Sequence, residues 1–122
     1  MKFSRDQLSA LSIRQVQPGS IHFGERTFET DVSVSADGKV EEFAMPDMAS
    51  LSEAHLHILL AGGPELIVVG TGWQPVFAPR ELVFALARRG IGLEAMDTPA
   101  ACRTFNILLA DERRLAAIFK VR

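Results

Sequence analysis

A chain of 122 residues, 48% of them hydrophobic, is long enough for one folded domain with its own core, whereas two domains of half this length would need disulfides or metals. The net charge of −2 argues against non-specific nucleic-acid binding, because that binding depends on clustered lysines and arginines. A single cysteine excludes an internal disulfide, and no apolar run reaches the ~20 residues of a membrane-spanning helix. We therefore expect one cytoplasmic domain over residues 1–122, without a membrane span.

The first half of the chain has the pattern of antiparallel strands. Strands are expected at 13–17, 21–23, 28–35 and 40–43, because turn residues separate them, Asp37-Gly38 being the clearest pair. Partial alternation of apolar and polar residues indicates one packed and one wet face. These strands predict an N-terminal antiparallel β meander.

Helices and strands alternate in the second half. Ser50 and Glu53 match a capping box that would begin a helix, and a second helix is expected to start near Pro79. Apolar runs predict strands at 66–69, 91–96 and 115–121, and a third helix follows Asp97. This order is typical of crossover connections, so we expect an α/β fold with a largely parallel part in its sheet.

Three segments together resemble a known family. They are Pro64–Gly72 (PELIVVGTG), Gly90–Thr98 (GIGLEAMDT) and Ala100–Leu108 (AACRTFNIL). In this order and spacing they resemble the Mth938-like (DUF498) family, which includes the mitochondrial respiratory complex I assembly factor 3 and small bacterial proteins of unknown function. The resemblance covers most of the chain and is strongest from residue 64 onward. No Arg- and Ser-rich leader precedes these segments, so the chain resembles the bacterial members.

The resemblance has consequences for fold and function. It implies a three-layer α/β domain with a mixed central sheet and an additional β layer. It implies neither an established enzyme activity nor a cofactor.

A glycine turn marks one candidate contact surface. Gly70, Thr71 and Gly72 would follow the carboxyl end of a buried strand, where open α/β sheets bind ligands. Trp73 would be a contact anchor there. The dinucleotide fingerprint and the Gly-Lys-Ser/Thr phosphate loop are both missing. A plain tight turn, with Trp73 covering the core, is the alternative.

The start of the third helix would form the other wall of this crevice. Asp97 or Thr98 would cap the helix. Arg103 and Asn106 lie three positions apart on one helical face and would hold a carboxylate or phosphate by charge-assisted hydrogen bonds. An internal network that ties the helix to the sheet edge explains the same pair equally well.

The cysteine and the histidines give weaker signals. The helix dipole and Arg103 would lower the pKa of the Cys102 thiol, but no motif links a histidine to it as a base. We therefore interpret Cys102 as a buried core residue. His55 and His57 are two positions apart and do not share a helical face, so we expect no metal site.

These observations favour a non-enzymatic binding or assembly module, linked to respiratory complex assembly through the family. Its partner would be a protein or a small anionic ligand, with no cofactor. The alternative is a small enzyme or sensor that binds an anionic metabolite between Gly70-Thr71-Gly72 and Arg103, with Asp97 or Cys102 as the reactive group. A homo-oligomer formed through the strand edges near Val32, Val34 and Phe43 is a third hypothesis.

Overall fold

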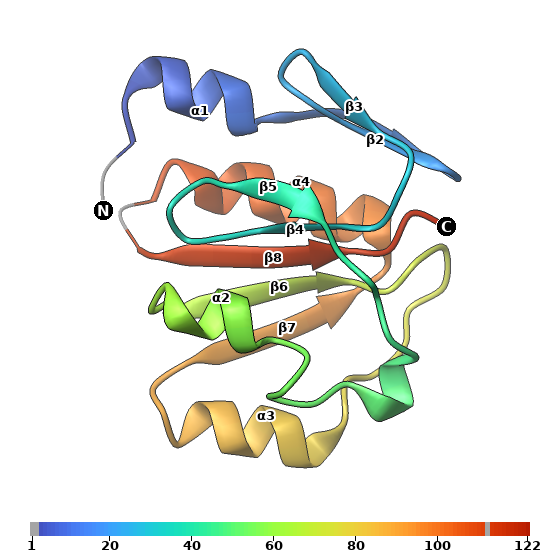
Figure 1. The fold of residues 1–122 in the computed structure, drawn as a ribbon, viewed down its shortest axis with the longest axis vertical. Coiled ribbons are helices and arrows are strands. Elements are labelled where there is room, and N and C mark those ends of the chain that lie inside the picture. The colour runs from blue at the N-terminus through green and yellow to red at the C-terminus, as the bar shows by residue number, and fades with distance from the viewer. Residues whose placement is uncertain (1–2, 112) are drawn as a thin grey trace.

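The computed structural model describes residues 3–111 and 113–122 and contains two β-sheets with helices between and around them (Figure 1). The smaller sheet has the order β1-β2-β3 and the larger one β5-β4-β8-β6-β7. The strands are β1 Ile13–Gln17, β2 Ser20–Phe23, β3 Arg26–Phe28, β4 Val32–Val34, β5 Val40–Glu42, β6 Leu66–Gly70, β7 Gly92–Met96 and β8 Leu115–Phe119. The helices are α1 Arg5–Leu11, η1 Met48–Ser50, α2 His57–Ala61, α3 Arg80–Ala87 and α4 Thr98–Leu109.

The central sheet is mixed and both of its faces are covered. Strand β6 pairs in parallel with β7 on one side and with β8 on the other, while β4 pairs antiparallel with β8 and β5. All five residues of β6 are buried, which explains their continuous apolar run. Val68 belongs to the core that α4 and the small sheet cover, and its neighbours Ile67 and Val69 belong to the core under α2 and α3. The predicted mixed α/β fold is therefore confirmed.

Aromatic side chains join the small sheet to the central one. Phe105 of α4 packs edge-on against Phe119 of β8 and against Phe23 of β2, with ring centroids 5.6 and 6.5 Å apart. Phe23 and Phe119 also meet directly, at 6.2 Å. Because the three rings are fully buried, α4 is held firmly between the two sheets.

The predicted N-terminal meander is only partly correct. β1, β2 and β3 form the expected antiparallel meander, but the predicted strand 28–35 is two strands, β3 and β4, which belong to different sheets. The Asp37-Gly38 hairpin does join β4 to β5, as predicted. Since β4 lies between β5 and β8, Val32 and Val34 are not on a sheet edge, and the edge pairing expected through them is wrong. The edge strand is β5, which directly precedes Phe43.

One helix prediction was wrong, and one helix was not predicted. Ser50 ends the short helix η1, and α2 begins only at His57 without a side-chain cap, so Ser50 and Glu53 form no capping box. A capping box is present instead at Ser4 and Gln7, at the start of the unpredicted α1. The starts of α3 and α4 follow the prediction. In the described parts of the chain, no helix combines the length and apolarity needed to cross a membrane.

Candidate functional site

The glycine turn and the start of α4 meet at the carboxyl end of β6, on the right-hand side of Figure 1. Thr98 is fully buried at this meeting point. Its Oγ1 donates to the carbonyl oxygen of Lys120 (2.6 Å) and accepts from the N–H of Gly72 (2.8 Å). The Thr98 N–H donates to the Gly72 carbonyl oxygen at 2.6 Å. We call Gly70, Gly72, Thr98 and their mutual contacts the locked junction.

Gly70 allows the close approach on which the locked junction depends. A Cβ atom at this position would lie 2.9 Å from Thr98 Oγ1 and 3.2 Å from both Thr98 Cα and Phe119 Cδ1. The Thr98 Cα belongs to the backbone of α4 and cannot turn away as a flexible side chain would. Glycine is therefore required by packing, and no ligand is needed to explain it.

Thr71 is also used inside the fold. Its N–H donates to the carbonyl oxygen of Met96 (2.8 Å), and its Oγ1 lies 2.8 Å from the carbonyl oxygen of Gln74 and 3.1 Å from that of Met96. The residue is buried, so its hydroxyl stabilises the turn and is not presented to solvent.

The first turn of α4 has no free N–H group for an anion. Asp97 caps the helix as predicted, with Oδ1 accepting from the N–H of Ala100 (2.9 Å) and its carbonyl oxygen accepting from Ala101 (2.8 Å). The Thr98 N–H is bound to Gly72, and Pro99 has none. The usual reason for anion binding at a helix start is therefore missing here.

Arg103 and Asn106 do not act together. Asn106 Oδ1 accepts from the N–H of Ile13 (2.9 Å) and its Nδ2 donates to the carbonyl oxygen of Ile13 (2.8 Å), so this amide pairs with β1 beside its bulge. Asn106 thus forms the internal network. Arg103 is exposed, and it forms no hydrogen bond or ion pair within the described residues. It alone of this pair remains available to a partner.

Cys102 is buried, as predicted. Burial raises the pKa of its thiol from 9.0 to about 12, although the neighbouring Arg103 guanidinium acts in the opposite direction. A thiol with this pKa is neutral at physiological pH and a poor nucleophile. In residues 3–111 and 113–122, no three side chains of His, Cys, Asp or Glu gather as a metal would require.

The residues that follow the locked junction are the most exposed apolar residues of this edge. Trp73 is 40% exposed, Val76 45% and Phe77 97%. We call residues 73–77 the aromatic loop. Sequence reasoning identified Trp73 but missed Val76 and Phe77. A signal was present, since apolar side chains stand here between Pro75 and Pro79 without helical or strand periodicity.

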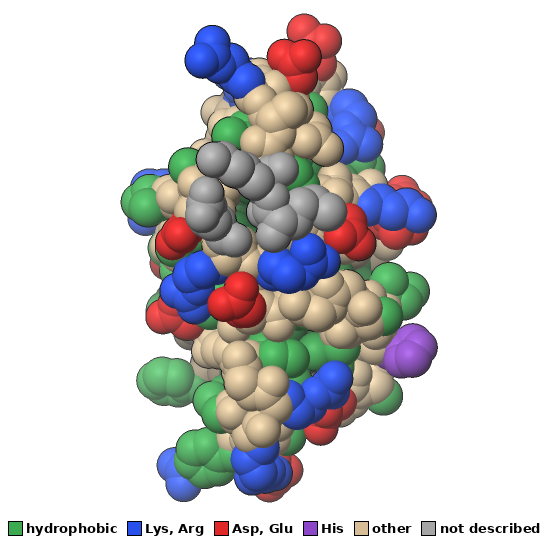
Figure 2. All heavy atoms as spheres, turned by 90° about the vertical axis from the view of Figure 1, so that its left-hand side faces the viewer, with side chains coloured by type: hydrophobic (Ala, Val, Ile, Leu, Met, Phe, Trp, Pro, Cys, Tyr) green, Lys and Arg blue, Asp and Glu red, His purple; other side chains and the backbone are tan. Residues whose placement is uncertain are grey.

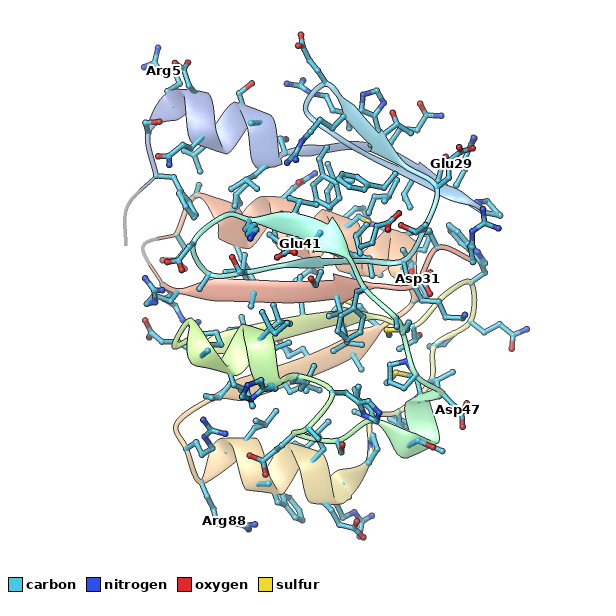
Figure 3. All side chains as sticks on the ribbon, viewed as in Figure 1. Arg5, Glu29, Asp31, Glu41, Asp47 and Arg88 are labelled. Atoms are coloured by element: carbon cyan, nitrogen blue, oxygen red, sulfur yellow. The ribbon has the colours of Figure 1, made fainter. Side chains whose placement is uncertain are left out.

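The opposite edge of the molecule carries charged side chains of both signs. Figure 2 shows the opposite edge of the molecule, at the amino ends of the parallel strands, where basic and acidic side chains are interleaved. Arg5, Glu29, Asp47 and Arg88 point outward from four different elements or loops in Figure 3 and are exposed. At the edge where the parallel strands end, the aromatic loop is therefore the candidate contact surface.

Comparison with known proteins agrees with this fold. The family model described as "Protein of unknown function (DUF498/DUF598)" matches residues 13–120. A Mth938-like domain from Bordetella pertussis, solved by solution NMR, superimposes with a TM-score of 0.75 over 99% of this chain and 92% of that one, at 26% identity.

Curated relatives match over shorter stretches. The "13 kDa major membrane protein" of Francisella tularensis is 33% identical over 59% of this chain and 58% of its own length. The "NADH dehydrogenase (ubiquinone) 1 alpha subcomplex assembly factor 3" of Danio rerio is 43% identical over 56% of this chain and 38% of its own length. The matched region thus spans well under two thirds of either relative.

Proposed function

We propose that this chain, which belongs to the DUF498/DUF598 family of proteins of unknown function, is a non-enzymatic docking module that contacts its partner through the aromatic loop. The observation that carries the proposal is the nearly complete exposure of Phe77, next to the exposed Trp73. Large aromatic side chains left in water are typical of contact surfaces, because burying them on a partner releases their hydrophobic free energy.

The rigidity of the base of the loop supports this function. Gly72, directly before the aromatic loop, is bound through both of its backbone polar groups to Thr98. At the other end, Pro79 stands at the N-cap position of α3, where its carbonyl oxygen accepts from the Val83 N–H. A loop held at both ends loses little conformational entropy when it binds, which favours recognition.

The relatives support a role in assembly. One relative is named as an assembly factor and another as a major membrane protein. We extend the assembly role to this chain as part of the proposal. A cytoplasmic location also belongs to the proposal, since a lone cysteine fits a reducing compartment.

The alternative of an enzyme or sensor for an anionic metabolite has less support. Of the residues it requires, Thr71, Thr98 and Asn106 use their polar side-chain atoms within the fold, and Cys102 is buried. Arg103 is the exposed member that remains. A thermal shift with anionic metabolites that is lost in Arg103→Ala would favour this alternative.

Site-specific photo-cross-linking tests the docking function. A photoreactive amino acid replaces Phe77 in one variant and Ile58 in a control, because Ile58 of α2 is 74% exposed and distant in sequence. We expect position 77 to give a discrete cross-linked product in cells and position 58 to give none of that product. Identical products from both positions, or neither a protein nor a lipid adduct from position 77, would show that the aromatic loop is not a docking surface.

A further inference from the structure

The shape of the aromatic loop restricts the kind of partner it fits. Phe77 is 97% exposed, so its ring stands clear of the rest of the protein and a partner must enclose it. The exposed area of Trp73, Val76 and Phe77 together falls short of the ~800 Å² per partner that a standard protein interface buries. A protruding apolar tip of this size is better suited to insertion into a deformable surface than to docking on a rigid one.

The charges beside the loop add a second restriction. Residues 71–80 contain one arginine, Arg80, and no acidic residue. Arg80 is exposed at the start of α3 and has no ion-pair or hydrogen-bond partner in the described structure. At the other end of the loop, the Lys120 side chain passes over Gly72, its Cδ 3.5 Å from where a Cβ on that glycine would lie. Cations therefore stand at both ends of the apolar tip.

Two carboxylates also lie near the loop and remain negatively charged, each at the start of a helix. Asp97 is occupied in capping α4. Glu81 follows Arg80 in the first turn of α3, where the helix dipole stabilises a negative charge.

A second exposed apolar side chain provides a contrast. Ile58 of α2 lines a small cavity together with Glu41 and Glu42, the first of which is labelled on β5 in Figure 3. Two carboxylates therefore lie beside Ile58, one of them, Glu41, paired with Lys39 at 3.6 Å. Exposure alone is thus shared by both places, but the aromatic loop has cations at its ends where Ile58 has Glu41 and Glu42 beside it.

We infer that the aromatic loop docks on the surface of a lipid bilayer that carries anionic headgroups, an inference that rests on the proposed docking function. Tryptophan and phenylalanine partition into the interfacial region of a bilayer, and lysine or arginine beside them binds the headgroups. A few apolar residues and two cations give weak, reversible binding, as one short lipid chain does. The protein would lie on the membrane without crossing it.

Vesicle binding tests the inference directly, because Trp73 is the sole tryptophan and the chain has no tyrosine. The purified full chain is titrated with vesicles of phosphatidylcholine alone and with vesicles that also contain phosphatidylglycerol. We expect Trp73 emission to shift to the blue and the protein to float with the phosphatidylglycerol vesicles only. Added salt should weaken the binding, since it screens the headgroup charge.

Three variants separate the contributions of the Phe77 ring and the Arg80 charge to vesicle binding from that of exposed apolar surface in general. Phe77→Ser should lower the affinity for phosphatidylglycerol vesicles about tenfold or more, because burial of this ring is the main apolar term. Arg80→Glu should lower it severalfold, and its exposed position makes unfolding an unsuitable explanation. Ile58→Ser is the matched control and should bind like the wild type.

Two results would overturn the inference. One is the absence of any Trp73 shift or flotation with phosphatidylglycerol vesicles, and the other is binding that Phe77→Ser leaves unchanged. A discrete protein cross-linked from position 77, together with no vesicle binding, would overturn the bilayer as partner while leaving the docking function in place. No protein or lipid adduct from position 77, together with no vesicle binding, would overturn both.

Discussion

The locked junction and the aromatic loop are consecutive in the chain but have opposite physical properties. At the junction, the Thr98 hydroxyl accepts from the Gly72 N–H, and the Thr98 N–H donates to the Gly72 carbonyl oxygen. In the loop, Phe77 exposes almost its whole ring to water. Residues with polar or reactive side chains therefore stabilise the fold at the junction, whereas residues without reactive groups form the candidate contact surface.

The largest expected effect tests the buried hydroxyl at the junction. Thr98→Val keeps the side-chain shape but leaves the Gly72 N–H and the Lys120 carbonyl oxygen without their hydroxyl partner, so the free energy of unfolding should fall by about 3 kcal/mol. Urea denaturation measures it. Thr98→Ser keeps the hydroxyl and should lose clearly less, and equal losses would show that the hydroxyl is unimportant.

A somewhat smaller loss is expected from filling the junction. Gly70→Ala places a Cβ 2.9 Å from Thr98 Oγ1, and the resulting overpacking should reduce the free energy of unfolding by about 2 kcal/mol. Gly62→Ala is a suitable control, because Gly62 has ordinary helical backbone angles and a Cβ there would lie 3.4 Å or more from its neighbours. If both variants were equally stable, the close approach would not matter.

The buried thiol near the junction should make stability depend on alkaline pH. The folded-state pKa of Cys102 is raised to about 12 from 9.0, so the unfolded chain loses this proton at lower pH than the folded one. The stability that the neutral thiol contributes is complete below pH 9 and is lost as pH rises toward 12. At pH 10, the free energy of unfolding should have fallen by about 1 kcal/mol. The free energy of unfolding, measured in urea at several pH values, should fall more steeply with pH for the wild type than for Cys102→Ala. Parallel curves would mean that the thiol is accessible to solvent.

The smallest effect on stability is expected in the aromatic loop. Phe77→Ser removes a ring that contacts little, so the free energy of unfolding should change by less than ~0.5 kcal/mol. Thermal unfolding checks this expectation. A loss comparable to that of Gly70→Ala would place Phe77 in the core and remove the contrast between the two regions.

Sequence patterns predicted some elements well because their signals are local. The apolar run of β6 and the cap at Asp97 depend on neighbouring residues, and both are observed. The capping box at Ser50 failed although its residue types were right. Such motifs state what a helix start requires, and they do not state that a helix will form. The extent of the domain, residues 1–122, stays a prediction.

The candidate site was less predictable, since its meaning depends on distant partners. Asn106 was left undecided between a ligand and an internal network, and its actual partner, Ile13, lies 93 positions away. The sequence also does not show which apolar side chains stay exposed to solvent. Phe77 and Phe105 are the same residue type, and only tertiary packing leaves the first exposed and buries the second.

By itself, the sequence determined the α/β class, the buried strands and the capped start of α4, because periodicity and capping act over a few residues. Tertiary structure decided that β4 joins the central sheet, that Thr98 and Gly72 close the expected crevice, and that Phe77 stays in water. These outcomes depend on which surfaces meet when the chain closes on itself. No local pattern carries that information.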